Sequence, residues 1–194
     1  MVKPKLIVIT GAPGTGKTTI AKKISEEFSL PLIIKDKIKE SLFDNLGWDI
    51  PGWDPDSWQK KIGIGSIELM HYFSRILISK TVSHIIESNF VPKFADQKLT
   101  DLRTKYPFSI FQIYVKCDHK VLIDRFKKRV SDPSRHPGHG EETYFDELEE
   151  ALSTNRFDKL SVFDDIFEID TTNFDKIDYQ ELSARLSQFL SINH

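Results

Sequence analysis

The 194-residue sequence contains one cysteine, Cys117, so the chain cannot form an internal disulfide bond. This scarcity is typical of proteins in a reducing cytoplasm. Acidic and basic residues nearly balance, with a net charge of -2, which gives no sign of a strongly basic nucleic-acid surface. No apolar run approaches the roughly 18 residues of a membrane span. We therefore expect a cytoplasmic protein that contacts no membrane and does not have nucleic acid as its main partner.

Two nucleotide-binding signatures are also missing. The sequence has no N-K-x-D, the motif with which GTPases bind guanine, and no G-x-G-x-x-G follows its first apolar run, which excludes a Rossmann dehydrogenase. Asp44-Asn45-Leu46-Gly47 matches D-x-x-G by its letters, but it follows an expected helix instead of a strand. These absences exclude two common classes of nucleotide-binding protein.

What the sequence does contain is GAPGTGKT, which begins at Gly11 and matches G-x-x-x-x-G-K-[ST]. Four apolar residues precede the motif, as a buried parallel strand requires, and a helical pattern follows it. Such a loop directs its backbone N–H groups at one spot, where they attract phosphate. Lys17 would reach the β- and γ-phosphates, and the Thr18 hydroxyl would hold Mg²⁺. The residues expected to bind the nucleotide here are Gly11, Ala12, Pro13, Gly14, Thr15, Gly16, Lys17, Thr18 and Thr19.

Along the rest of the chain, expected strands alternate with expected helices. This alternation predicts an α/β fold with a parallel sheet covered by helices on both faces. Ligands of such sheets bind beyond the carboxyl ends of the strands, so the residues just after each strand are the informative ones. The expected strands are 5–10, 31–35, 82–87, 108–116 and a segment within 162–170. The expected helices are 17–28, 37–46, 59–79, 94–105, 119–130, 141–156 and 179–190.

With this motif and this order of elements, the chain resembles the small P-loop kinases. That group includes nucleoside monophosphate kinases, gluconate kinases, chloramphenicol phosphotransferases and polynucleotide 5′-hydroxyl kinases. The resemblance covers nearly the whole chain, and the P-loop is its most specific motif. It implies a P-loop NTPase three-layer sandwich with a five-stranded parallel sheet in the order 2-3-1-4-5. It also implies one domain over residues 1–194, an acceptor-side insertion at about 37–60, a helical lid at about 125–142, and ATP and Mg²⁺ as cofactors.

Two carboxylates follow expected strands. Asp36 comes after the second strand, where the resemblance implies a general base that takes the proton of the acceptor hydroxyl. The alternative is that Asp36 caps a helix that starts at Lys37. Glu87 ends the third strand, where the resemblance implies a Walker B carboxylate that binds Mg²⁺. Glu is longer than the more usual Asp, so a role in holding substrate stays open, as does a merely solvated strand end.

Three arginines follow the fourth strand. Arg125 and Arg129 lie four residues apart, on one face of the expected helix, and Arg135 is in the loop after it. The resemblance implies that the pair covers ATP and that Arg135 meets the transferred phosphoryl group, since guanidinium pairs bidentately with phosphate. The alternative is a basic face paired with the acidic stretch 141–150. Thr171 and Thr172, after the fifth strand, resemble the loop that contacts adenine.

The acceptor is not identified by the sequence. Trp48, Trp53 and Trp58 lie where relatives hold the acceptor, but they could equally pack the core of the small insertion. His136 and His139 have a spacing compatible with zinc, yet no cysteine pair lies nearby. We expect an ATP-dependent kinase of a small hydroxyl-bearing molecule that is a monomer or a homodimer. The alternatives are a polynucleotide 5′-hydroxyl kinase and a P-loop ATPase without an acceptor.

Overall fold

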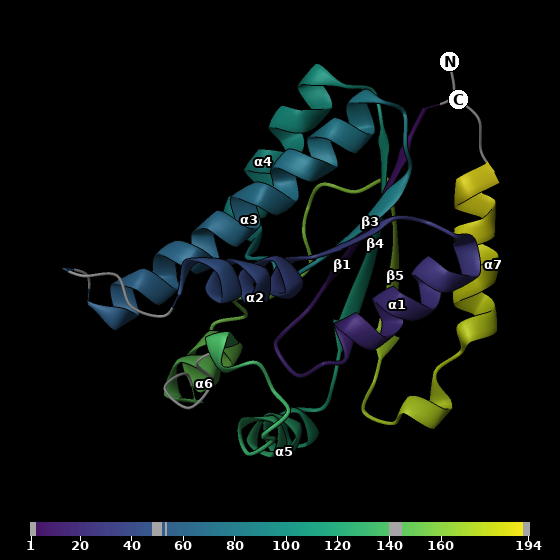
Figure 1. The fold of residues 1–194 in the computed structure, drawn as a ribbon. Helices are drawn as coiled ribbons and strands as arrows, with labels where there is room; N and C mark the ends of the chain where they lie inside the picture. The colour runs from purple at the N-terminus through teal and green to yellow at the C-terminus, as the bar shows by residue number, and fades with distance from the viewer. Residues whose placement is uncertain (1–2, 48–51, 53, 140–144, 192–194) are drawn as a thin grey trace.

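The computed structural model describes residues 3–47, 52, 54–139 and 145–191 (Figure 1). Within these residues the strands form one sheet of parallel pairs in the order β2-β3-β1-β4-β5. This confirms the predicted P-loop NTPase fold and its strand order. The strands are β1 (Lys5–Thr10), β2 (Leu32–Ile34), β3 (His84–Glu87), β4 (Ser109–Lys116) and β5 (Asp165–Asp170).

Helices cover both faces of the sheet and so form the two outer layers of the sandwich (Figure 1). On one face lie α1 (Lys17–Phe28) and α7 (Tyr179–Ser191), and on the other α3 (Pro55–Ser79) and α4 (Pro92–Lys105). Among the described residues, the other helices are α2 (Lys35–Leu46), α5 (His119–Val130), α6 (Phe145–Ser153) and the short 3₁₀ segments η1 (Pro137–His139) and η3 (Phe174–Lys176).

The central strand shows why this sequence forms a doubly covered sheet. Side chains of a strand point alternately to its two faces. In β1, Ile7 and Ile9 pack with α1 and α7, whereas Leu6 and Val8 pack with α3 and α4. All four side chains are fully buried. A continuous apolar run is therefore what this position requires.

Some boundaries differ from the predicted ones. Helix α3 begins at Pro55 and not at residue 59, because the Asp54 side chain accepts hydrogen bonds from the backbone N–H groups of Asp56 and Ser57. Proline suits the first helical position, where its missing N–H is not needed. Helix α2 begins at Lys35, two residues before the predicted start. Helix α6 ends at Ser153 and not at residue 156, while predicted helical residues 141–144 lie outside the described residues.

The region of the predicted insertion consists mainly of α2 and the first turns of α3. Trp58 is nearly buried there, in a cluster with Phe43 and Ile62, and its indole N–H donates a hydrogen bond of 3.1 Å to the Gly47 carbonyl. These contacts favour a packing role for Trp58. Trp48 and Trp53 lie outside the described residues.

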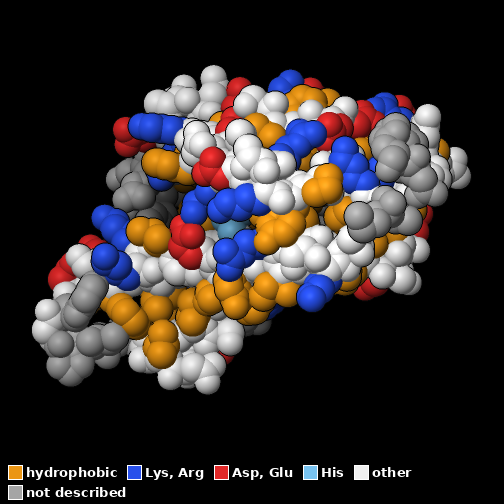
Figure 2. Space-filling view, turned by 90° about the horizontal axis from the view of Figure 1, so that it is seen from above, with side chains coloured by type: hydrophobic (Ala, Val, Ile, Leu, Met, Phe, Trp, Pro, Cys, Tyr) orange, Lys and Arg blue, Asp and Glu red, His pale blue; other side chains and the backbone are white. Residues whose placement is uncertain are grey.

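The surface of α3 and α4 is partly apolar. Figure 2 looks down on the molecule and shows hydrophobic side chains gathered in a band across this face. Exposed large hydrophobic side chains on these two helices are Ile64, Tyr72, Phe73, Ile76 and Phe94. Exposed apolar patches are often contact surfaces, so the expectation of a monomer or a homodimer stays open. None of the described helices is both long enough and apolar enough to cross a bilayer.

Candidate active site

The glycine loop runs from the end of β1 to the start of α1 in a conformation that needs glycine. Gly11 has a φ of +144°, and a Cβ atom there would lie 2.1 Å from the Val115 carbonyl oxygen. Gly16, the residue before α1, has a φ of +86°. The loop can therefore pass close to the end of β4 and turn directly into the helix, whose N-terminal N–H groups form an anion-binding site.

The loop is held in place by its own residues and by the segment after β5. The Thr171 hydroxyl donates a 2.6 Å hydrogen bond to the Thr15 carbonyl, and the Thr15 hydroxyl donates one of 2.9 Å to the Ala12 carbonyl. The Lys17 ammonium also donates to the Ala12 carbonyl, at 2.8 Å. Burial lowers the pKa of Lys17, and the negative charges of Glu87 and Asp36 act against that effect. Lys17 is thus a buried cation at the loop, close to two carboxylates.

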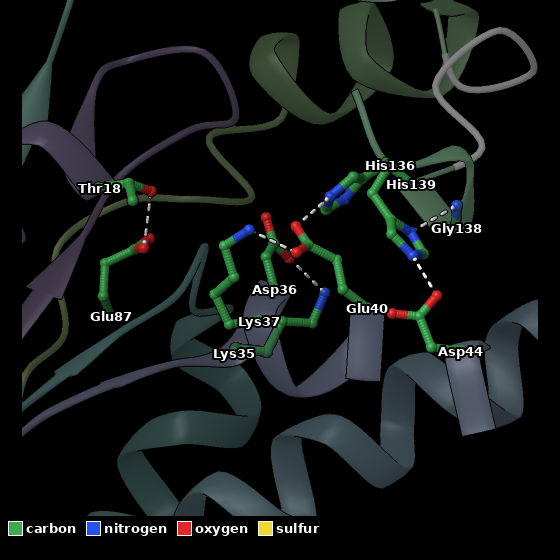
Figure 3. A network of polar contacts seen from close by, with 10 residues as sticks. All are labelled: Thr18, Lys35, Asp36, Lys37, Glu40, Asp44, Glu87, His136, Gly138 and His139. Atoms are coloured by element: carbon green, nitrogen blue, oxygen red, sulfur yellow. Dashed lines mark hydrogen bonds and ion pairs between the residues drawn. The ribbon is translucent and has the colours of Figure 1, made fainter. Parts of the chain in front are cut away.

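Thr18, in the first turn of α1, contacts Glu87, the last residue of β3. The Thr18 hydroxyl donates a hydrogen bond of 2.8 Å to Oε2 of Glu87, as Figure 3 shows. Glu87 is only 5% exposed, so the interpretation as a solvated strand end is wrong. Burial raises the pKa of Glu87, while the Lys17 charge and the Thr18 hydrogen bond lower it. A hydroxyl and a carboxylate oxygen side by side fit a hard cation such as Mg²⁺.

Asp36 lies in the first turn of α2, at the same end of the sheet. The helix begins at Lys35 with Ile34 as its N-cap, so the capping alternative for Asp36 is wrong. Its Oδ1 is 3.0 Å from the Lys35 ammonium. Burial alone would raise the pKa of Asp36, but Lys35, His139 and Lys17 outweigh it and hold the pKa well below its usual range. Asp36 is therefore an ionised carboxylate.

Arg125 is directed to the segment that follows β5. Its guanidinium donates to the Thr171 carbonyl at 2.7 Å and to the Thr172 carbonyl at 3.3 Å. It also lies 4.8 Å from the centroid of the Phe174 ring. Phe174 in turn covers the loop, since a Cβ atom on Gly16 would lie 2.4 Å from its ring. The structure therefore brings together Arg125, the segment after β5 and the glycine loop.

The charges of the other two arginines affect different groups. The charge of Arg129 lowers the pKa of Lys17, which places Arg129 within electrostatic reach of the glycine loop. The charge of Arg135 lowers the pKa of His139, which places Arg135 near the loop segment over α2. The predicted lid arginines are thus divided among the segment after β5, the glycine loop and the neighbourhood of α2.

Sequence reasoning noted that Lys35 flanks Asp36 and would keep it ionised, and the two side chains do pair. It missed Glu40, one helical turn after Asp36, which contacts His139 at 2.9 Å (Figure 3). The spacing of Asp36 and Glu40 is a usable signal, since residues four apart share a helix face. His139 and His136 were considered only as metal ligands. Among the described residues no group of three metal-ligating side chains occurs, and both histidines contact carboxylates of α2.

A family model described as an AAA domain matches residues 7–146, which is more than half of the chain. The chain belongs to this AAA domain family. The match to the AAA domain begins in β1 and ends in α6, so it includes the glycine loop, Asp36, Glu87 and the three arginines, but not Thr171 and Thr172. No curated protein matches the sequence.

Several solved structures resemble this chain over nearly all of its residues. A proposed kinase from Chloroflexus aurantiacus j-10-fl has a TM-score of 0.84 and 28% identity, with 100% of each chain covered. A sugar kinase from Janibacter sp. HTCC2649 has a TM-score of 0.56 and 19% identity, covering 98% of this chain and 95% of its own. Shikimate kinase from Bacteroides thetaiotaomicron has a TM-score of 0.53 and 17% identity, covering 96% of this chain and 98% of its own. The resemblance to small P-loop kinases is confirmed.

Proposed function

We propose that this protein is an ATP-dependent phosphotransferase that moves the γ-phosphoryl group to a hydroxyl of a small molecule. The observation that carries the proposal is the grouping at the carboxyl end of the sheet. There a buried loop lysine, Lys17, lies in the electrostatic field of both Glu87 and Asp36, and Glu87 is bonded to Thr18. A phosphate-binding loop with a second carboxylate across the site is what transfer to a hydroxyl requires.

The loop residues fit a nucleoside triphosphate. The glycine loop leads directly into the N-terminus of α1, whose backbone N–H groups attract phosphate, and the buried Lys17 supplies the cation for the β- and γ-phosphates. Arg125, with the segment that follows β5, would hold the base. Thr18 and Glu87 would hold Mg²⁺, and bound Mg²⁺ neutralises the charge that develops between the phosphates.

Asp36 would act on the acceptor. Its ionised carboxylate accepts a hydrogen bond from the acceptor hydroxyl and orients that oxygen toward the γ-phosphorus. As the new O–P bond forms, the bond from the γ-phosphorus to the bridging oxygen breaks, ADP leaves with that electron pair, and the hydroxyl proton passes to Asp36. A carboxylate of low pKa is a weak base, so its main contribution is to orient the hydroxyl in a loose transition state.

Arg129 and Arg135 would stabilise the transferring group. Arg129 lies within electrostatic reach of Lys17, and Arg135 of His139. A planar guanidinium pairs well with the equatorial oxygens of a phosphoryl group in transfer. These two residues therefore bring positive charge from α5 and its following loop to the site.

An acceptor screen tests the proposal. ATP consumption is measured with nucleosides, sugars, shikimate, aminoglycoside and phenicol antibiotics, and 5′-hydroxyl oligonucleotides, with the Lys17→Ala protein as the control for contaminating activity. We expect at least one small hydroxyl compound to raise consumption above the basal rate and to gain a phosphoryl group by mass spectrometry. Stimulation by oligonucleotides alone would replace the proposal with a polynucleotide kinase. A basal rate that no acceptor changes would leave a P-loop ATPase.

A further inference from the structure

The loop that follows α5 is docked on one face of α2 by two histidine–carboxylate contacts (Figure 3). His139 Nε2 lies 2.9 Å from Oε1 of Glu40, and His136 Nε2 lies 2.9 Å from Oδ1 of Asp44. Glu40 and Asp44 are one helical turn apart, so they lie on the same face of the helix. The two contacts therefore follow one line along α2.

An apolar contact lies between these polar ones. Gly138 is buried, and a Cβ atom there would lie 2.5 Å from Cδ2 of Phe43, whose side chain is itself fully buried. The backbone N–H of Gly138 donates to Nδ1 of His136 at 3.1 Å. The other ring nitrogen, Nε2, then faces Asp44. The loop thus fits α2 closely and leaves no room for a side chain at Gly138.

The two polar contacts differ in strength because they differ in exposure. The His139 side chain is 9% exposed and that of Glu40 is 16% exposed, whereas the Asp44 side chain is 63% exposed. Exposed pairs contribute little, while shielded charge-assisted hydrogen bonds contribute more. Glu40 is held from its other side by the Lys37 ammonium. The His139–Glu40 contact is therefore the main polar attachment of the loop.

This contact joins the two elements that carry groups of the proposed reaction. Glu40 lies one turn after Asp36 on α2, and His139 lies four residues after Arg135 on the loop. The charges that face His139 are those of Glu40, Asp36 and Arg135, and His136 is its ring neighbour at 6.2 Å between centroids. Movement of the loop away from α2 would therefore separate Arg135 from Asp36.

We propose that His139 and Glu40 are positioning residues, which hold the loop after α5 against α2 so that Arg135 and Asp36 face the same acceptor hydroxyl. This inference rests on the proposed function for its consequence in turnover, but the docking itself can be measured without an acceptor. His139 and Glu40 act through Arg135 and Asp36 and take no proton from the substrate.

Hydrogen exchange of the full-length protein tests the docking. In Glu40→Gln and His139→Phe, we expect amides of residues 135–139 to exchange about tenfold faster, with α7 unchanged as a control for folding. His139→Gln, whose amide N–H can replace the Nε2–H, should stay within about threefold of wild type. Gly138→Ala should accelerate exchange without altering either polar partner. Unchanged exchange of residues 135–139 in Glu40→Gln, His139→Phe and Gly138→Ala would overturn the proposal.

Kinetics with the acceptor found by the screen tests the positioning role. Glu40→Gln and His139→Phe should each lower kcat about tenfold and leave the Kd for ATP within twofold, and the double variant should be no slower than either single one. Asp44→Asn should have a clearly smaller effect. Additive losses, or equal loss of ATP binding, would contradict the positioning role. Should no acceptor be found while exchange accelerates as expected, the proposed function fails and the docking contact stands.

Discussion

The Thr18 hydroxyl donates a hydrogen bond of 2.8 Å to Oε2 of Glu87, although the two residues are 69 positions apart in the sequence. Parallel pairing of β1 with β3 places Ile9 beside Glu87, and the loop after β1 then returns to the same end of the sheet. A residue of the phosphate-binding motif therefore meets a buried carboxylate at the end of the neighbouring strand. This contact supports the assignment of both residues to one Mg²⁺ site.

Glu87→Gln tests that assignment, because it keeps the shape of the side chain and removes its charge. We expect the Mg²⁺-dependent gain in ATP affinity to fall at least fivefold, since an amide is a weaker ligand for a hard cation than a carboxylate. ATP binding in EDTA should change less. The measurement is calorimetric titration of ATP with and without Mg²⁺. An unchanged dependence on Mg²⁺ would remove Glu87 from the metal site.

Arg129→Ala and Arg135→Ala should reduce turnover more than nucleotide binding. Arginines that meet charge developing in phosphoryl transfer are worth roughly 10³-fold or more in rate, whereas ground-state binding uses less of that charge. Lys128→Ala, an exposed cation on the same helix, is the matched control and should leave both quantities unchanged. The check is kcat with the best acceptor beside the Kd for ATP. Wild-type kcat in both arginine variants would show that the lid interpretation is wrong.

A half-buried histidine, His71, and a fully buried one, His84, predict a loss of stability in mild acid. Burial, assisted by the charge of Lys98, lowers the pKa of His71 from 6.5 to about 4. Burial also lowers the pKa of His84, although the hydrogen bond of its ring to the Val82 backbone acts in the opposite direction. The unfolded chain then binds more protons than the folded one, so stability is full above about pH 6.5 and declines toward pH 4. The lowered pKa of His71 accounts for a loss of up to about 3 kcal/mol in the free energy of unfolding.

The measurement is the free energy of unfolding in urea across that range. His71→Gln cannot titrate there, so its stability should decline less steeply than that of the wild type, by about 1 to 3 kcal/mol at pH 4.5. Curves that run parallel for the two proteins would show that His71 does not titrate as inferred. Comparison of the two proteins cancels the contribution of Glu87, whose raised pKa acts in the opposite sense.

Much of the fold follows from local patterns. The apolar run of β1, the glycine motif and the helix after it are specified by adjacent residues, and strand–helix alternation then determines the parallel sheet. The start of α3 was missed because Asp54 and Pro55 lie among Gly and Trp residues that indicate a loop, although Asp–Pro is itself a helix-start signal. Local propensity therefore predicted the elements better than their ends.

The site was predictable where it depends on position after a strand. Lys17 and Thr18 belong to one motif, and Glu87 follows from the end of β3. The contact of His139 with Glu40 joins residues 99 positions apart and depends on the packing of Gly138 against Phe43, which no local pattern encodes. Phe174 was missed for the same reason, because its contacts with Arg125 and Gly16 come from three separate segments.

Asp36→Asn tests the central claim most directly, because it separates a kinase from a plain ATPase. The change keeps the size of the side chain and removes its charge and basicity. We measure ATP affinity by calorimetry beside the rate of transfer to the best acceptor, with Asp101→Asn, an exposed aspartate of α4, as the control. The account predicts ATP affinity within about threefold of wild type and transfer reduced by roughly 10²-fold, because a misoriented acceptor hydroxyl costs about that much in rate. Full transfer activity in Asp36→Asn would contradict it.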